Sequence, residues 1–375
     1  MLRKLLVLSA PIALLLLLEA LFAGGLWEPL AQPASHAGTS VRLKRALEDS
    51  ALPRLDYVTL GSSRPEYGLD HALLAASAQA VGRVHGDLSM PGSHWTTIGI
   101  VSRWLQRHRP EVRGGIIALS VQDLQFANNG SYELGILQPF RRIDDTPWIA
   151  ARIPVKRGDL ESYAVWSALF GWRDDIREFV RSPGSRLARI EWYAAQRPPR
   201  RALFDGPTST QSMCAFGLES LDACNRVDIS GDPRRESLGR QCRELRSLAS
   251  HRLDFDAGVA DGSLPPVLLQ SRDLVRAQLR EVKWRVRPVV VLMPMPQVWQ
   301  RDVLGPGQHQ WALSVLQPLV DEGSIQLVDG TDFFSHDADG GCSAFFDFYH
   351  QNAIGRDRFT RWLLPQLKQK LYQAQ

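Results

Sequence analysis

The feature that most constrains the fold is an alternation between short apolar stretches and segments with helical spacing. The predicted strands lie at 56–60, which is rich in β-branched residues, at 80–90, which also contains a turn, and at 114–121, 287–293 and 325–329. The segments with helical spacing lie at 66–78, 95–108, 265–284, 309–319 and 355–372. Strands that alternate with helices predict a mostly parallel sheet with helices on both faces. We therefore expect an α/β fold with three layers, α/β/α, around a mostly parallel five-stranded sheet.

Length and composition permit a large folded domain. The chain has 375 residues, of which 44% are hydrophobic, enough for one α/β domain with an insertion or for two domains. The net charge of +4 is small for this length, and basic residues are scattered among acidic ones. Nucleic-acid binding is therefore not expected.

The N-terminal segment has the pattern of a membrane anchor. Arg3 and Lys4 precede an apolar run, residues 5–27, in which Glu19 is the only charged residue. A bilayer span needs about 20 apolar residues, whereas the apolar part of a cleaved signal peptide has about 7–15. We predict an uncleaved single-pass transmembrane helix in a bacterial inner membrane, with the following domain in the periplasm. Glu19 would face a partner helix or, as we prefer, lie near the outer interface.

The alternation breaks between the third and fourth predicted strands. Residues 124–264 are rich in Trp, Arg and Pro, and they predict a large, mainly helical insertion. Insertions at the strand ends commonly form the wall of a substrate site. The predicted organisation is thus an anchor at 1–27, a spacer at 28–40, and a sheet domain in two parts, 41–123 and 265–375.

The four cysteines suit two disulfides in an exported domain. Cys214 and Cys224 flank a short loop and are the expected pair, which leaves Cys242 to pair with Cys342. Zinc binding is the competing interpretation. The spacings lack a Cys-x-x-Cys unit and no histidine pair lies nearby, so no metal is expected.

Two serines directly follow the first predicted strand, in the turn Gly61-Ser62-Ser63. Ligands of open α/β sheets bind beyond the carboxyl ends of the strands, and the free N–H groups of a helix start favour a developing anion. Ser62 or Ser63 is therefore well placed for nucleophilic chemistry. Turn formation and helix capping explain the same residues without any chemistry.

A base that suits such a serine follows the last predicted strand. A serine hydroxyl needs a base to take its proton, and the base needs an acid to orient it. His350 follows Asp347 by three residues, so one turn can bring the carboxylate beside the imidazole. In a doubly wound sheet, the loops after the first and last strands can converge. His85, His94 and His108 are rival bases that we expect to be structural.

In this order, the motifs resemble those of the SGNH, or GDSL-like, hydrolase superfamily. The matching segments are Gly61-Ser-Ser63, Ser89-Met-Pro-Gly92, Ser120-Val-Gln-Asp123 and Asp347-Phe-Tyr-His350. The chain most resembles the membrane-anchored, exported branch, which includes the D-alanine transfer protein of teichoic acid modification and the alginate O-acetylation proteins. The resemblance covers the two parts of the predicted sheet domain and leaves out the insertion.

The resemblance implies a role for each matched residue. Ser63 would be the nucleophile, His350 the general base, and Asp347 the acid that holds the imidazole in the right tautomer. Gly92 would contribute a backbone N–H to the oxyanion hole. Gln122 would contribute its side chain, although the family has Asn at this position. The resemblance thus implies a Ser-His-Asp acyl-ester enzyme that needs no cofactor.

The substrate is less constrained than the chemistry. Arg64, beside the nucleophile, would bind an acidic substrate or cover the helix start, and neither interpretation is favoured. The resemblance implies O-acyl transfer to, or removal from, a cell-envelope glycan, with a membrane-bound O-acyltransferase as the implied partner. The alternatives are a plain carboxylesterase or lipase, and a non-catalytic protein that binds polysaccharide during envelope assembly.

Overall fold

The computed structural model describes residues 2–125, 131–153, 155, 157–196, 203–204, 206–218, 220–226, 233–250 and 252–373. The chain forms two compact units. The first comprises Met1–Leu52, Gly92–His108 and Asn128–Leu203. The second comprises Pro53–Pro91, Arg109–Ala127 and Phe204–Gln375. The predicted boundaries at 124 and 264 do not coincide with these units, because residues 204–264 group with the sheet and residues 92–108 group with the N-terminal segment.

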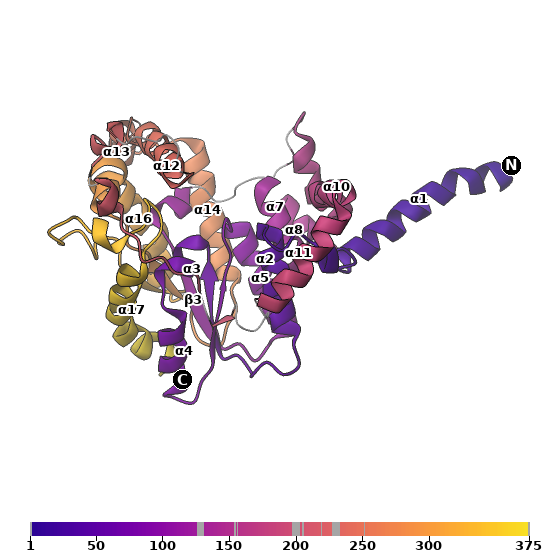
Figure 1. The fold of residues 1–375 in the computed structure, drawn as a ribbon, viewed down its shortest axis with the longest axis horizontal. Coiled ribbons are helices and arrows are strands. Elements are labelled where there is room, and N and C mark those ends of the chain that lie inside the picture. The colour runs from indigo at the N-terminus through magenta and orange to yellow at the C-terminus, as the bar shows by residue number, and fades with distance from the viewer. Residues whose placement is uncertain are drawn as a thin grey trace. The chain divides into compact units, whose positions relative to one another are not determined.

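The second unit is built on a five-stranded parallel sheet (Figure 1). Its strands are β1 (Tyr57–Gly61), β2 (His85–Ser89), β3 (Gly114–Leu119), β4 (Val289–Leu292) and β5 (Gln326–Asp329), in the order β2-β1-β3-β4-β5. Every residue of β1 to β4 is buried, as expected for parallel strands that are covered on both faces. The predicted α/β class and five-stranded parallel sheet are confirmed.

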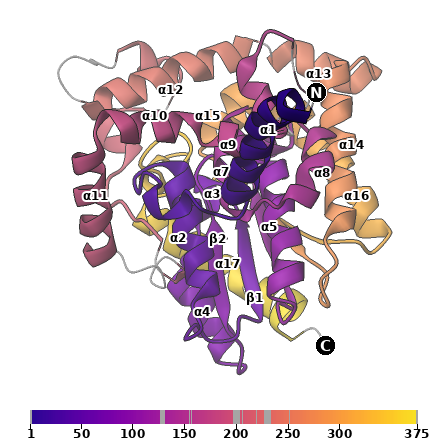
Figure 2. The same cartoon turned by 90° about the vertical axis from the view of Figure 1, so that its right-hand side faces the viewer.

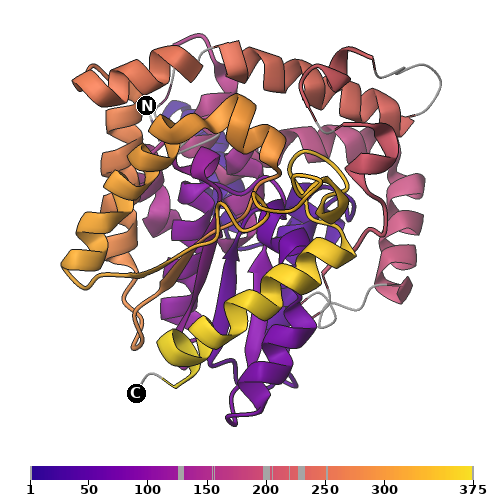
Figure 3. The ribbon, with the colours of Figure 1, turned by 90° about the vertical axis from the view of Figure 1, so that its left-hand side faces the viewer.

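Helices of the second unit cover both faces of this sheet. The helices described in this unit are α3 (Ser63–Gly68), α4 (His71–Gln79), α6 (Val121–Gln125), α12 (Pro233–Ser250), α13 (Arg252–Asp261), α14 (Pro266–Glu281), α15 (Gln297–Trp299), α16 (Gly305–Asp321) and α17 (Ala353–Leu367). The chain leaves β1 toward one edge of the sheet and leaves β3 and β4 toward the other. Right-handed crossovers therefore place α4 on one face and α14 with α16 on the opposite face. The last helix, α17, packs against α4 and crosses the sheet in Figure 3.

The first unit is mainly helical. Its helices are α1 (Leu2–Ala23), α2 (His36–Glu48), α5 (Trp95–His108), α7 (Ser131–Leu137), α8 (Thr146–Ala150), α9 (Ala168–Gly171), α10 (Arg173–Arg181) and α11 (Pro183–Gln196). A small apolar core joins the end of α1 to α2 and α9 through Phe22, Val41 and Ala168. In the described part of the chain, no helix is both long enough and apolar enough to cross a bilayer. The membrane anchor stays a prediction.

The turn after β1 depends on a glycine. A Cβ on Gly61 would lie 2.4 Å from Cγ of Pro65 and 2.5 Å from the carbonyl oxygen of Ala118, so no larger residue fits. The chain enters α3 at Ser63, earlier than the predicted helix start near residue 66. The single predicted helix is instead two helices, since α4 begins anew after Asp70, whose carboxylate accepts a hydrogen bond from the backbone N–H of Leu73.

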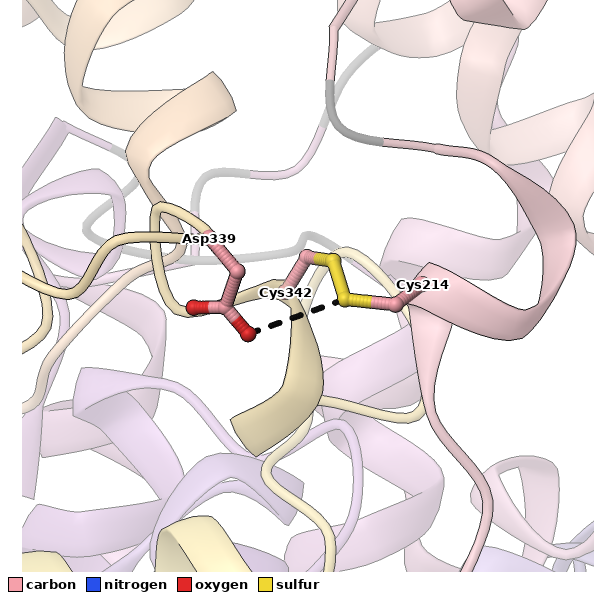
Figure 4. Close-up of side chains that lie close together, drawn as sticks. All are labelled: Cys214, Asp339 and Cys342. Carbon is pink, nitrogen blue, oxygen red and sulfur yellow. Dashed lines mark hydrogen bonds between the residues drawn. A yellow bond between two sulfur atoms is a disulfide. The ribbon is translucent and has the colours of Figure 1, made fainter.

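The predicted disulfide pairing is wrong. The bonds join Cys214 to Cys342 and Cys224 to Cys242, with Cα atoms 5.3 and 5.6 Å apart (Figure 4 shows the first). Proximity along the sequence misled the prediction, because backbone pairing brings distant segments together. The N–H of Met213 donates to the carbonyl oxygen of Phe345 at 2.8 Å, which lays Cys214 beside the segment that contains Cys342. Cys224 is left to pair with Cys242 on α12.

Candidate active site

Three side chains from two distant segments form a chain of hydrogen bonds in the second unit. Nε2 of His350 lies 2.8 Å from Oγ of Ser63, the first residue of α3. Nδ1 of the same imidazole lies 2.9 and 3.0 Å from the two carboxylate oxygens of Asp347. These distances satisfy the order nucleophile, base and orienting acid that an activated serine requires. The predicted convergence of the two loops is therefore observed.

Asp347 is held as an oriented carboxylate. Its Oδ1 accepts hydrogen bonds from the backbone N–H groups of Tyr349 and His350, each at 2.8 Å. Burial by itself would raise the pKa of Asp347. The nearby charge of His350, its hydrogen bond and the two backbone donors outweigh burial, so the pKa lies below its ordinary value. An ionised carboxylate favours the Nδ1–H tautomer of His350, which leaves Nε2 free to accept the proton of Ser63.

The loop that carries the acid and base is short and closed on itself. The N–H of Phe346 donates to the carbonyl oxygen of His350 at 3.1 Å, and Phe345 pairs with Gln351 in an antiparallel bridge. Asn352, which is 1% exposed, ends the loop. Its side-chain oxygen caps α17, and its amide nitrogen donates to the carbonyl oxygens of Gln211 and Ser343. These bonds fix the imidazole relative to the helix that follows it.

Aromatic side chains surround the imidazole. The ring of Phe346 stacks on His350 with an interplanar angle of 14° and centroids 5.6 Å apart. The ring of Tyr67, which follows the nucleophile on α3, lies 5.1 Å from the same imidazole. The side chain of His350 is nevertheless 19% exposed, so the Ser63–His350 pair can meet a substrate from one side. The aromatic contacts limit ring rotation and keep Nε2 directed toward Ser63.

Arg64 and Gln122 are linked to each other. One guanidinium nitrogen of Arg64 donates to Oε1 of Gln122 at 2.6 Å, and another lies 3.6 Å from the carboxylate of Asp123. The guanidinium also lies 5.5 Å from the ring centroid of Tyr349. Arg64 is only 8% exposed. This burial favours the interpretation that Arg64 covers the helix start, and its bond to the amide oxygen orients the side chain of Gln122.

Gly92 belongs to the first unit, where it opens the segment Gly92–His108. Its backbone φ is 73°, in the left-handed region that glycine adopts readily. Ser63 belongs to the second unit. Its predicted part in the oxyanion hole stays a prediction.

Sequence reasoning missed Gln241, on α12. Its amide nitrogen donates to Oδ2 of Asp347 at 3.3 Å, and its amide oxygen accepts the N–H of Phe348 at 3.1 Å. Figure 2 shows α12 at the end of the sheet where α3 begins. The neighbouring residue Cys242 ties this helix to Cys224, so a disulfide fixes the segment that supports the acid. A glutamine inside the predicted insertion carries no sequence signal for this role.

The structure places the rival histidines outside the hydrogen-bonded series of the second unit that joins Ser63 to Asp347. His94 and His108 belong to the first unit. His85 is buried in β2 between Oγ1 of Thr59, at 2.9 Å, and the hydroxyl of Tyr372, at 2.8 Å. Burial, with the charge of a nearby histidine, lowers the pKa of His85 to about 3. It is therefore neutral at physiological pH and serves as a hydrogen-bonding member of the core.

Only one group of metal-ligating residue types comes together in the described part of the chain. It consists of Cys214, Asp339 and Cys342 (Figure 4). The disulfide uses both sulfur atoms, and Asp339 accepts hydrogen bonds from the N–H groups of Gly341 and Ser343. These contacts assign the group a structural role in the loop before Phe345.

No protein-family model matches this chain, and no curated protein matches it significantly. The geometry of Ser63, His350 and Asp347 therefore carries the functional argument. The arrangement can generate an alkoxide-like nucleophile at neutral pH. The predicted role of Gln122 in an oxyanion hole stays a prediction, because its described contact is the bond from Arg64.

Proposed function

We propose that the chain is a serine-dependent acyl-ester enzyme. The single observation that carries the proposal is the unbroken hydrogen-bonded series from Ser63 through His350 to Asp347. Surface Asp-x-x-His pairs are common, but such a pair directed at a hydroxyl on the turn after the first strand is specific to nucleophilic chemistry. The resemblance to SGNH hydrolases rests on motifs that contain these three residues, and it implies the same roles for them.

The mechanism follows from the positions of these atoms. Oγ of Ser63 attacks the carbonyl carbon of an ester, while Nε2 of His350 takes the hydroxyl proton. The negative charge on the carbonyl oxygen is met by N–H donors, for which Gln122 and backbone amides are the candidates. His350 then returns the proton to the departing alcohol as the carbon–oxygen bond breaks. Water, or a sugar hydroxyl, releases the acyl group from Ser63 by the same steps in reverse.

We further propose that the enzyme acts in a bacterial periplasm, anchored in the inner membrane, on acyl groups of a cell-envelope polysaccharide. Three features support this setting: the apolar N-terminal run, the resemblance to the exported branch of the family, and the two disulfides. Disulfides persist in oxidising compartments and are rare in the cytosol. A membrane-bound O-acyltransferase is the partner that this setting suggests.

A fluorophosphonate probe tests the proposal, because it reacts covalently only with an activated serine. We expect the full-length protein to be labelled and the Ser63→Ala variant to remain unlabelled. Ser62→Ala is the matched control: Ser62 is the adjacent hydroxyl, and its side chain accepts a hydrogen bond from the N–H of Arg64 at 3.4 Å. The control should keep its labelling. A wild-type protein that takes up no probe would instead favour the non-catalytic polysaccharide-binding alternative.

A second assay separates transfer from hydrolysis. Rapid turnover of a simple aryl ester without any glycan would favour the plain carboxylesterase or lipase. Turnover that rises when an acceptor polysaccharide is added would favour acyl transfer. Ser63→Ala should abolish both activities, since each passes through the same acyl-enzyme.

A further inference from the structure

A stripe of exposed apolar side chains runs along one side of a short helix in the first unit. Residues Leu160–Val165 form a 3₁₀ helix, and Trp166 continues it with a helical backbone. Leu160, Tyr163 and Trp166 are 71%, 45% and 57% exposed. Side chains three residues apart align on a 3₁₀ helix, so these three form one surface. We call it the Leu160–Trp166 stripe.

The other two sides of this helix are buried in the unit or carry an ion pair. Ser162 and Val165 face inward and are buried. Glu161, on the remaining side, is paired with Arg173 at 2.6 Å. The fold of the unit therefore leaves uncovered the side of the helix that carries the stripe.

The stripe is attached to the end of α1. The residue after Trp166 is Ser167, whose hydroxyl donates to Oε2 of Glu19 at 2.7 Å. The backbone N–H groups of Ala168 and Leu169, at the start of α9, also donate to the Glu19 carboxylate. The helices α1 and α9 lie beside each other in Figure 2. The one acidic residue of the apolar run thus caps a helix in the same unit, where a carboxylate is favourable.

On the N-terminal side of Glu19, residues 10–18 of α1 carry no polar side chain. Four consecutive residues, Leu14, Leu15, Leu16 and Leu17, are each between 55% and 65% exposed. Four consecutive positions cover the full circumference of a helix. A helix that exposes apolar side chains all round requires an apolar environment all round, which a bilayer supplies and a single protein groove does not. The position of Glu19 marks where that environment ends.

We propose that the Leu160–Trp166 stripe lies in the headgroup layer of the bilayer that receives α1. The inference rests on the proposed membrane anchor and adds a second contact to it. Tryptophan and tyrosine are enriched at this depth because each ring has an apolar body and a polar atom, and the flanking leucine supplies apolar area. The helical unit is then held flat on the membrane by two elements joined through Glu19, instead of swinging on a single helix.

Fluorine NMR of the full-length chain tests this proposal. The protein is labelled with 5-fluorotryptophan and placed in nanodiscs of phosphatidylethanolamine and phosphatidylglycerol. The Trp166 resonance is the one missing from the Trp166→Phe variant. Trp192, on α11 of the same unit, is a matched control because it is 56% exposed but lies outside the stripe, and Trp192→Phe assigns its resonance.

Nitroxide lipids then report depth. A nitroxide near the ester end of the acyl chain should broaden the Trp166 resonance severalfold, a nitroxide near the methyl end should broaden it less, and neither should broaden that of Trp192. Equal linewidths for the two tryptophans would overturn the proposal and leave a protein partner as the occupant of the stripe. Failure of the chain to enter nanodiscs would overturn it together with the anchor. Fluorophosphonate labelling in the same nanodiscs tests Ser63 separately, so either idea can fail alone.

Discussion

Replacing Asp347 by Asn should disable the site without unfolding it. Oδ1 of Asp347 accepts three N–H groups, those of Tyr349, His350 and the imidazole Nδ1. The oxygen of an asparagine would take this position, because an NH₂ group cannot accept. Its NH₂ group would then replace Oδ2, which lies 2.9 Å from Nδ1 of His350 and 3.3 Å from the amide nitrogen of Gln241.

At the shorter of the two Nδ1 contacts, two donors would then face each other, which favours the other tautomer of the imidazole. Nδ1 would accept from the new NH₂ group, and Nε2 would carry the proton. A protonated Nε2 cannot take the proton of Ser63, 2.8 Å away. The corresponding exchange in serine proteases lowers kcat about 10⁴-fold, equivalent to about 5 kcal/mol of barrier. We expect a loss of about this size in Asp347→Asn.

The assay is the second-order rate of fluorophosphonate labelling, with the midpoint of thermal unfolding measured in parallel. Asp339→Asn is the control, because Asp339 lies in the preceding loop and also accepts backbone N–H groups but does not touch the imidazole. It should label at close to the wild-type rate. The reasoning is refuted if folded Asp347→Asn labels within about tenfold of the wild-type rate, because loss of the correct tautomer should slow labelling by about 10⁴-fold.

Two further predictions concern residues around the sheet. Gln241→Leu removes two hydrogen bonds, one to Asp347 and one from the N–H of Phe348. Labelling should slow by about tenfold, because the lost bond to Asp347 contributes about 1–1.5 kcal/mol. An unchanged rate would show that Asp347 keeps its place without α12. His85 has a pKa of about 3 in the fold and an ordinary value near 6.5 in the unfolded chain, so only the unfolded chain takes up a proton between these values. Its contribution to stability is complete above pH 6.5 and decreases as the pH falls toward 3, by about 2 kcal/mol between pH 7 and pH 5. Denaturant unfolding at the two pH values should show this loss in wild type and a smaller one in His85→Gln, and equal losses would contradict the assignment.

The sheet was accessible from sequence because its strands have local patterns, and the meeting of Ser63 with His350 followed from the parallel topology that those strands predict. Buried parallel strands read as continuous apolar runs, so residues 287–293 indicated the strand found at Val289–Leu292. The topology of such a sheet directs the loops after its first and last strands to one end. Ser63 and His350 therefore meet although 287 positions separate them.

The disulfides and the support for Asp347 were not accessible, because they depend on contacts between distant segments. Cys214 lies ten positions from Cys224, but the pairing of Met213 with Phe345 carries it to Cys342. Gln241 has no neighbouring motif, and only the packing of α12 gives it a role. The division into two units was equally hidden, since α5 has the spacing of an ordinary crossover helix yet groups with the N-terminal segment.

Trapping the acyl-enzyme tests the central claim most directly. The full-length protein is mixed briefly with an aryl acetate, quenched in acid and digested with trypsin. Because trypsin cuts poorly between Arg64 and Pro65, Ser63 is released within residues 55–83. We predict an acetyl group on Ser63 in this peptide, located by fragmentation and absent from Ser63→Ala. Acetylation of Ser62 or of another residue, with Ser63 unmodified while ester is consumed, would contradict the account.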